Sequence, residues 1–258
     1  MAARSGPPLC LRDVPVFTDR AVSKQSGNMD FSADEIGAVR LSLRVAFWAM
    51  LGSLPFGLVT ALVLARGRFW GKILLDGVVH LPLVMPPVVT GYLLLLLFGR
   101  HGPLGRFFAE SLGIVFAFRW TGAALACAVM GFPLLVRAIR LSLEAVDRRL
   151  EEAAGTLGAG RTFVFLLVTL PLIVPGIVAG MVLSFARSLG EFGATITFVS
   201  NIPGETRTIA SAIYTLTQTP GGDVGALRLT LVSIALSLVA LLAADLLAQC
   251  LGRRVSGD

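Results

Sequence analysis

The segment EEAAGTLGAGRTFVFLLVTLPLIVPGI, residues 151–177, decides the fold of this chain. Residues 151–161 hold two glutamates, three glycines and an arginine, whereas residues 162–177 hold no charged side chain. A helix needs about 20 apolar residues to cross a bilayer, so the apolar half predicts the start of a membrane-spanning helix. The polar half is then expected at the membrane edge, where its small residues predict a compact turn rather than a flexible loop.

The rest of the chain repeats this pattern of long apolar runs between short polar segments. Charged residues make up 15% of the sequence, against about a quarter in soluble domains, and 55% of the residues are apolar. Other windows without Asp, Glu, Lys or Arg are 45–65, 77–99, 120–136 and 229–244. We therefore predict an all-α integral membrane protein with five transmembrane helices, at about 37–65, 75–99, 119–138, 164–188 and 228–251.

These spans set the expected domains. Residues 1–35 form a polar N-terminal extension, and Met29, which opens a segment with a helix-start pattern, is a candidate for the true start. Residues 36–252 form the transmembrane domain, and residues 253–258 form a short tail. The stretch 189–227 is too short for a soluble domain, so we expect it to be part helix and part irregular backbone packed against the bundle.

Charge indicates orientation rather than a nucleic-acid partner. The net charge is +6, and Lys and Arg flanking the spans account for it. Simple counts leave the orientation open, but the density of Lys and Arg is highest in 66–72 and 137–161. This density favours a cytoplasmic position for both loops, with the N-terminus outside and the C-terminus in the cytoplasm. The cysteines and the two histidines have no disulfide or metal-ligand spacing, so we expect no metal site.

The polar residues 151–161, here called the polar island, and the residues just before them predict an amphipathic helix followed by a second short helix. Its apolar residues recur at steps of three and four, which predicts one helix over 143–157 with the stripe Leu143, Val146, Leu150, Ala153 and Leu157. Gly158 and Gly160 are expected to end this helix, and a second one to start near Arg161 and run past Pro171. Two short helices meeting at a glycine would form a rigid elbow, which another surface could approach over Ala153 and Ala154.

Candidate pathway or gating residues lie within the spans. Pro86 and Pro87 predict a kink in the second span, which is either an ordinary bend or the lining of a moving pathway. Arg187 and Glu191, four apart, are either an intrahelical ion pair or a gate. The third group shares one helix face and serves either helix packing or a pathway or dimer axis: Gly176, Gly180, Ser184 and Ser188.

The spacing of the polar island resembles the EAA motif of permease subunits of ATP-binding-cassette (ABC) importers. The matching residues are Glu152, Ala153, Ala154, Gly158, Leu170 and Pro171, with Val168 where isoleucine is usual. The resemblance implies a MetI-like fold in which these residues form a cytoplasmic coupling-helix elbow. In that family the elbow sits in a groove of a separate ATPase subunit, which binds ATP and magnesium, and this chain would bind no cofactor.

Within that superfamily the chain is similar to molybdate permeases. The similarity covers about 36–251 and is carried by 41–66, 81–105, 184–208 and 212–223. Sulfate permeases share the segment 188–194, so a sulfate or thiosulfate permease is the alternative. The resemblance implies a homodimer in the bacterial inner membrane, two ATPase subunits and a periplasmic molybdate-binding protein, with tungstate carried as well.

Catalysis by this chain is not expected. It has no GxxxxGK[ST] phosphate loop, no HExxH pair and no GxSxG turn. The remaining alternative is an unenergised channel or scaffold, which would purify without an ATPase subunit.

Overall fold

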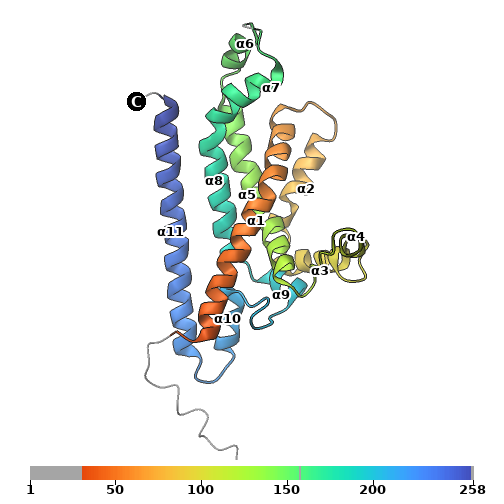
Figure 1. The fold of residues 1–258 in the computed structure, drawn as a ribbon, viewed down its shortest axis with the longest axis vertical. Coiled ribbons are helices and arrows are strands. Elements are labelled where there is room, and N and C mark those ends of the chain that lie inside the picture. The colour runs from red at the N-terminus through yellow and green to blue at the C-terminus, as the bar shows by residue number, and fades with distance from the viewer. Residues whose placement is uncertain (1–30, 157, 257–258) are drawn as a thin grey trace, which may run out of the picture. The chain divides into compact units, whose positions relative to one another are not determined.

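The computed structural model describes residues 31–156 and 158–256 (Figure 1). The chain divides into a unit of residues 1–32 and a unit of residues 33–258. The candidate start at Met29 and the extension before it lie outside the described residues. The described part of the second unit is helical, as predicted, and contains α1 (Ala33–Arg66), α2 (Lys72–Val84), α3 (Pro87–Phe98), α4 (Pro103–Leu112), α5 (Trp120–Ala145), α6 (Arg148–Thr156), α7 (Arg161–Val164), the π-helical segment η1 (Phe165–Thr169), α8 (Leu170–Leu189), α9 (Gly193–Val199), α10 (Ile209–Thr217) and α11 (Asp223–Ser256).

Five spans are present when one broken pair is counted as a single crossing. Four helices of the described chain are long and apolar enough to span a bilayer: Ala33–Arg66, Trp120–Ala145, Arg161–Leu189 and Asp223–Ala243. The fifth crossing is α2 with α3, two helices bent by 114°. Four to five candidate spans agree with the five predicted, and the second one, expected to be a single kinked helix, is instead two helices.

Two consecutive prolines, Pro86 and Pro87, cause the break between α2 and α3. Met85 and Pro86 each precede a proline, and a residue in that position is sterically kept out of the helical region. Both adopt extended backbone, with ψ of 147° and 131°. Pro87 then opens α3, where its missing N–H costs nothing. Two extended residues in a row turn the chain much further than the kink that one proline makes inside a helix.

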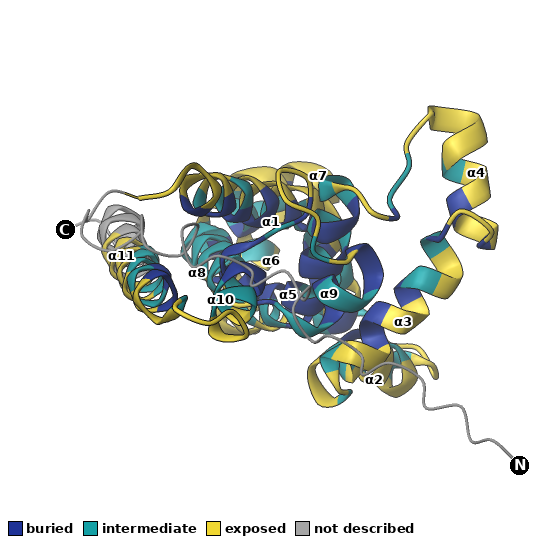
Figure 2. Cartoon of the chain, turned by 90° about the horizontal axis from the view of Figure 1, so that it is seen from below, coloured by how far each residue is buried: buried dark blue, intermediate teal, exposed yellow. Residues whose placement is uncertain are grey.

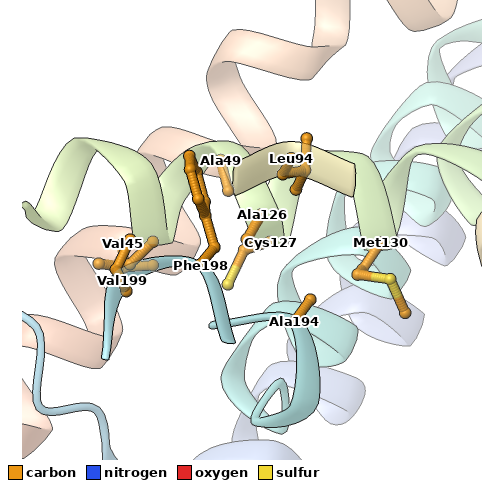
Figure 3. Close-up of a cluster of buried hydrophobic side chains, with 10 residues drawn as sticks. Val45, Ala49, Leu94, Ala126, Cys127, Met130, Ala194, Phe198 and Val199 are labelled. Atoms are coloured by element: carbon orange, nitrogen blue, oxygen red, sulfur yellow. The ribbon is translucent and has the colours of Figure 1, made fainter. Parts of the chain in front are cut away.

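The bundle core is formed by α1, α5 and α8, with α5 packed between the other two. At one end the core is aliphatic, with Leu64, Leu135, Ile139 and Ile173 fully buried. At the other end α9 joins α5, and Phe198 fills the space among small residues (Figure 3). Lipid tails are as apolar as these side chains, so close van der Waals packing, rather than escape from water, holds this core together.

The stretch 189–227 combines helix and irregular backbone, as expected. Between α9 and α10 the backbone is irregular, and its polar groups find partners within the chain. The Thr206 hydroxyl accepts from the Ile202 N–H at 2.9 Å, and Ser42 of α1 accepts from the Ile209 N–H at 2.7 Å. Non-helical backbone is tolerated near lipid only when it is satisfied in this way.

The two ends of the bundle differ. The start of α1 lies at one end, with α10 and the start of α11, whereas α6, α7 and the end of α11 lie at the other (Figure 1). Large apolar side chains are exposed around the outside, including Phe56, Ile73 and Leu231, and exposed positions dominate the outer faces in Figure 2. Apolar side chains on the outer faces as well as in the core are typical of a protein surrounded by lipid or by other membrane subunits.

Candidate functional site

The elbow is made of two short helices that project from one end of the bundle (Figure 1). It does not begin as predicted, because α5 ends at Ala145 and a separate α6 starts at Arg148. The Asp147 carboxylate accepts from the Arg149 N–H at 2.9 Å, as a side chain that caps a new helix does. Leu143 is therefore buried in α5 while Leu150 is half exposed in α6, so the predicted stripe is not one helical face.

The turn after α6 contains Gly158 in a left-handed conformation, with φ of +85°. Residues with a Cβ rarely adopt this conformation, so the glycine is required by the backbone. Apart from its chain neighbours, no described residue has an atom within 4 Å of a Cβ built on Gly158. Glu152 and Ala153 are exposed and Ala154 is half-buried. The elbow therefore presents an open surface, and its glycine is not needed for packing within the chain.

Leu170 and Pro171 lie at the start of α8, below the elbow. Pro171 has no N–H to bond one turn back, and the turn before it is widened into the π-helical segment η1, where the Leu170 N–H bonds to the Phe165 carbonyl. A continuous 29-residue span from Arg161 to Leu189 results. The second helix of the elbow thus runs directly into a membrane-spanning helix, which is a mechanical connection.

Glu151, which the sequence did not single out, anchors the elbow to the bundle. Its carboxylate accepts hydrogen bonds from both terminal nitrogens of Arg66, the last residue of α1, and from the Thr169 hydroxyl in η1. The hydrogen bonds from Arg66 lower the pKa of Glu151, although partial burial opposes them. Arg66 and Glu151 are 85 positions apart, so no local spacing could have revealed the pair.

A hollow of about 460 Å³ lies beside this contact, lined by residues of α1, α6, α7 and η1. Its lining is mixed in charge and includes Arg66, Arg148, Glu151, Glu152 and Arg161. The hollow belongs to the elbow, and its open side is continuous with the exposed surface of the elbow described above.

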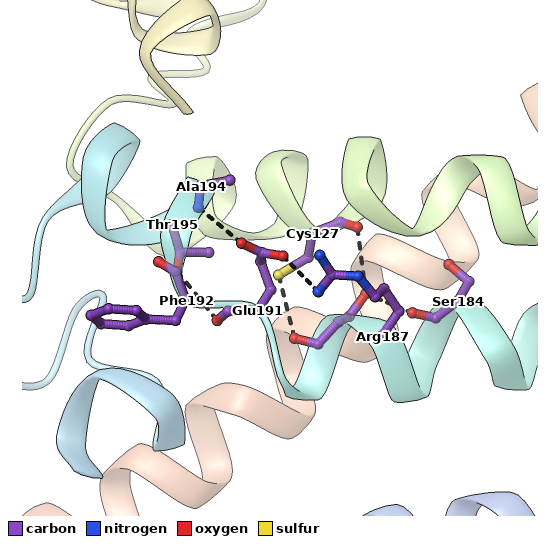
Figure 4. A network of polar contacts seen from close by, with 8 residues as sticks. Cys127, Ser184, Arg187, Glu191, Phe192, Ala194 and Thr195 are labelled. Carbon is purple, nitrogen blue, oxygen red and sulfur yellow. Dashed lines mark hydrogen bonds and ion pairs between the residues drawn. The ribbon is translucent and has the colours of Figure 1, made fainter. Parts of the chain in front are cut away.

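The small-residue face of α8 is covered by α5 of the same chain. A Cβ on Gly131 of α5 would lie 2.5 Å from the Ser184 hydroxyl oxygen, and one on Gly176 would lie 2.2 Å from the Ser142 Cβ. Ser188 contacts Cys127, and both Ser184 and Ser188 are buried (Figure 4). In this structure the small-residue face serves packing between two helices of one chain, which is one of the alternatives given above. The face consists of Gly176, Gly180, Ser184 and Ser188.

Arg187 and Glu191 form an ion pair of 2.7 Å, but they do not share a helix. Helix α8 ends at Leu189, and the Glu191 carboxylate also accepts from the Ala194 N–H at 2.8 Å, in the first turn of α9 (Figure 4). Glu191 is 2% exposed. Of the two alternatives given for this pair, the intrahelical one does not hold, because Gly190 ends α8, and the pair links the last turn of α8 to the segment that leads into α9.

The break between α2 and α3 packs against the junction of α8 with α9. A Cβ on Gly193 would lie 2.7 Å from the Pro87 Cβ, and one on Gly91 would lie 2.5 Å from the Ala194 carbonyl. Glu191, Pro87 and α9 therefore belong to one packed region, while Pro86 forms the bend itself. This region is built separately from the elbow, and α5 and α8 run between the two (Figure 1).

Comparison with known proteins gives consistent matches. A family model described as binding-protein-dependent transport system inner membrane component matches residues 53–256. The molybdenum transport system permease protein ModB of Escherichia coli K12 is 64% identical over 212 residues, which are 82% of this chain and 93% of that protein. The sulfate transport system permease protein CysT of Salmonella typhimurium is 38% identical over 222 residues, 86% of this chain and 79% of that protein.

Two solved structures share the fold. A bacterial ABC transporter that imports the acidic polysaccharide alginate has a TM-score of 0.68 at 19% identity, covering 89% of this chain and 86% of that one. The methionine ABC transporter MetNI, in inward-facing form, has a TM-score of 0.60 at 13% identity, covering 84% and 94%. The predicted MetI-like arrangement of helices is thereby confirmed.

Proposed function

The chain belongs to the family of binding-protein-dependent transport system inner membrane components, and we propose that it carries molybdate into the cell. As a multi-pass permease subunit of an ABC importer it is a transport component, and the partner ATPases of such importers hydrolyse ATP. The observation that carries the molybdate proposal is the 64% identity to a molybdenum transport permease over nearly the whole of that protein. Tungstate, an anion of the same shape and charge, is expected to follow the same route.

The proposed mechanism starts at the elbow. Two ATPase subunits bind ATP and magnesium, close, and draw together the elbows of two copies of this chain. Because α7, η1 and α8 form one continuous helical span, movement of the elbow reaches the membrane core directly. The paired bundles then switch between inward- and outward-open states as rigid bodies.

The remaining partners follow from the direction of transport. A periplasmic molybdate-binding protein would deliver the anion to the end of the bundle opposite the elbow. At that end Arg228 pairs with Glu35 at 3.0 Å, and Arg207 lies 3.8 Å from Asp34. The proposed orientation places the elbow and the end of α11 in the cytoplasm and the start of α1 outside.

Sulfate is the second candidate substrate, favoured by the 38% identity to a sulfate permease. Uptake of labelled molybdate and labelled sulfate, each at submicromolar concentration, separates the two. Cells lacking this chain are compared with cells in which it is restored. If cells lacking this chain lose only molybdate uptake, the proposal is supported. If they lose only sulfate uptake, the chain is still an importer subunit, but its substrate is sulfate.

A further inference from the structure

Helix α6 has little packing against the bundle, although the proposed function requires it to transmit movement. None of its nine residues is buried, and it contacts η1 and α7. Its described neighbours are also outside helices, at 146–147 on one side and at 158–160 on the other. An element of this kind would swing at both ends unless a specific contact fixed it.

Glu151 supplies that contact. Its side chain is 16% exposed and receives donors from two other elements, Arg66 at the end of α1 and the buried Thr169 in η1. The pairing with Arg66 is bidentate, which fixes direction as well as distance. The neighbouring Glu152 is exposed, so of the two consecutive glutamates Glu151 is the one that is partly buried.

We propose that Glu151 is a positioning residue that clamps the elbow to α1 and to the start of α8, so that ATPase movement turns the bundle instead of flexing α6. The inference rests on the proposed function, since it assigns a role in coupling. Arg66 makes α1, the first span, part of the same moving body. Loss of the clamp is therefore expected to leave ATP hydrolysis in place and to lower the number of anions moved per ATP.

The test uses the complete importer, reconstituted in vesicles with its ATPase subunits and binding protein. The variants are Glu151→Gln, Arg66→Gln and Thr169→Val. Glu144→Gln is the matched control, because Glu144 pairs with Arg140 at 2.8 Å, four residues away on α5, and does not touch the elbow. ATP hydrolysis and anion uptake are measured together, with labelled molybdate and, separately, labelled sulfate.

We expect Glu151→Gln and Arg66→Gln to lower the anions moved per ATP by roughly twofold to thirtyfold, the range of energetic coupling through such contacts. The control should keep the wild-type ratio. A merely structural role would reduce the yield of assembled complex and leave this ratio unchanged. Equal ratios in wild type, Glu151→Gln and Arg66→Gln would overturn the proposal.

Charge exchange tests the pairing itself. The double variant Arg66→Glu with Glu151→Arg should recover a large part of the ratio lost in each single variant. A double variant as impaired as the two losses combined would show that the residues act separately, which contradicts a clamp.

Failure of the proposed substrate is distinguishable from failure of the clamp. If the wild-type complex moves sulfate and not molybdate, the proposed substrate is wrong. The number of anions moved per ATP is then measured with sulfate. Hydrogen exchange of α6 amides in the complex provides a readout that needs no substrate. Exchange should be faster in Glu151→Gln than in wild type, and unchanged exchange would overturn the clamp.

Discussion

Substitutions at Gly158 can distinguish the cost of backbone strain from the effect of contact with a partner protein. Any side chain there is strained by the φ of +85°, at a cost of about 1 kcal/mol. Among the described residues other than its chain neighbours, no atom lies within 4 Å of a Cβ at this exposed position, so the strain is the cost that alanine and tryptophan share in the isolated permease. Only a partner surface can tell them apart.

We therefore expect Gly158→Ala to retain the ATPase subunit on purification and Gly158→Trp to lose both the subunit and uptake. Thermal unfolding of each permease variant alone provides the control for folding. Uptake that survives Gly158→Trp at normal expression would contradict the assignment of this surface as the docking site.

Glu151 gives a prediction about pH. Arg66 holds the pKa of Glu151 below its ordinary value of 4.5 in the folded protein. A carboxylate with a lowered folded-state pKa contributes stability that is complete above the unfolded value and is lost as pH falls through the folded value. The clamp should thus stay intact from pH 7 to pH 5 and release only below the ordinary carboxyl range.

The measurement is hydrogen exchange of α6 amides between pH 7 and pH 4, corrected for the intrinsic rate. Protection of α6 in the wild type should be flat to about pH 5, whereas Glu151→Gln should be less protected throughout. A loss of wild-type protection between pH 7 and pH 6 would mean that another group controls the elbow.

At the scale of elements, the broken second span offers a matched pair of glycines. Gly91 in α3 lies against α9, where a Cβ would come within 2.5 Å of the Ala194 carbonyl oxygen, whereas a Cβ on Gly77 in α2 would meet nothing within 4 Å. Backbone cannot move aside cheaply, so Gly91→Ala should destabilise the protein by about 1–3 kcal/mol. Gly77→Ala should be neutral or stabilising, because alanine favours a helix.

Thermal unfolding in detergent measures both glycine variants. Similar unfolding temperatures for Gly91→Ala and wild type would indicate that α3 and α9 are not packed as closely as described. The comparison is informative because the two substitutions are chemically identical and lie in the same broken span.

At the scale of the whole molecule, the path of the chain predicts the topology. The start of α1 and the end of α11 lie at opposite ends of the bundle, and the elbow shares the end of α11 (Figure 1). A reporter enzyme active only outside the cytoplasm should therefore be active when fused after Gly221, between α10 and α11, and inactive when fused after Gly160. The reverse pattern would invert the orientation and place the elbow out of reach of a cytoplasmic ATPase.

The sequence by itself determined the features that depend on neighbouring residues. Uncharged windows located the candidate spans, since a helix that crosses a bilayer needs about 20 predominantly apolar residues. The spacing from Glu152 to Pro171 located the elbow, and paired prolines marked the second span as bent. The position where α6 begins was missed, because a helical spacing of apolar residues does not show that Asp147 caps a new helix.

Only the tertiary structure decided which distant elements meet. The pairing of Arg66 with Glu151, the covering of the α8 face by α5 and the contact of Gly91 in α3 with α9 each depend on how helices approach in space. Small residues permit a close approach without naming the partner, and a charge is compatible with any opposite charge that the fold brings near. Local chemistry therefore specified the helices and the elbow, while packing specified the contacts that join them.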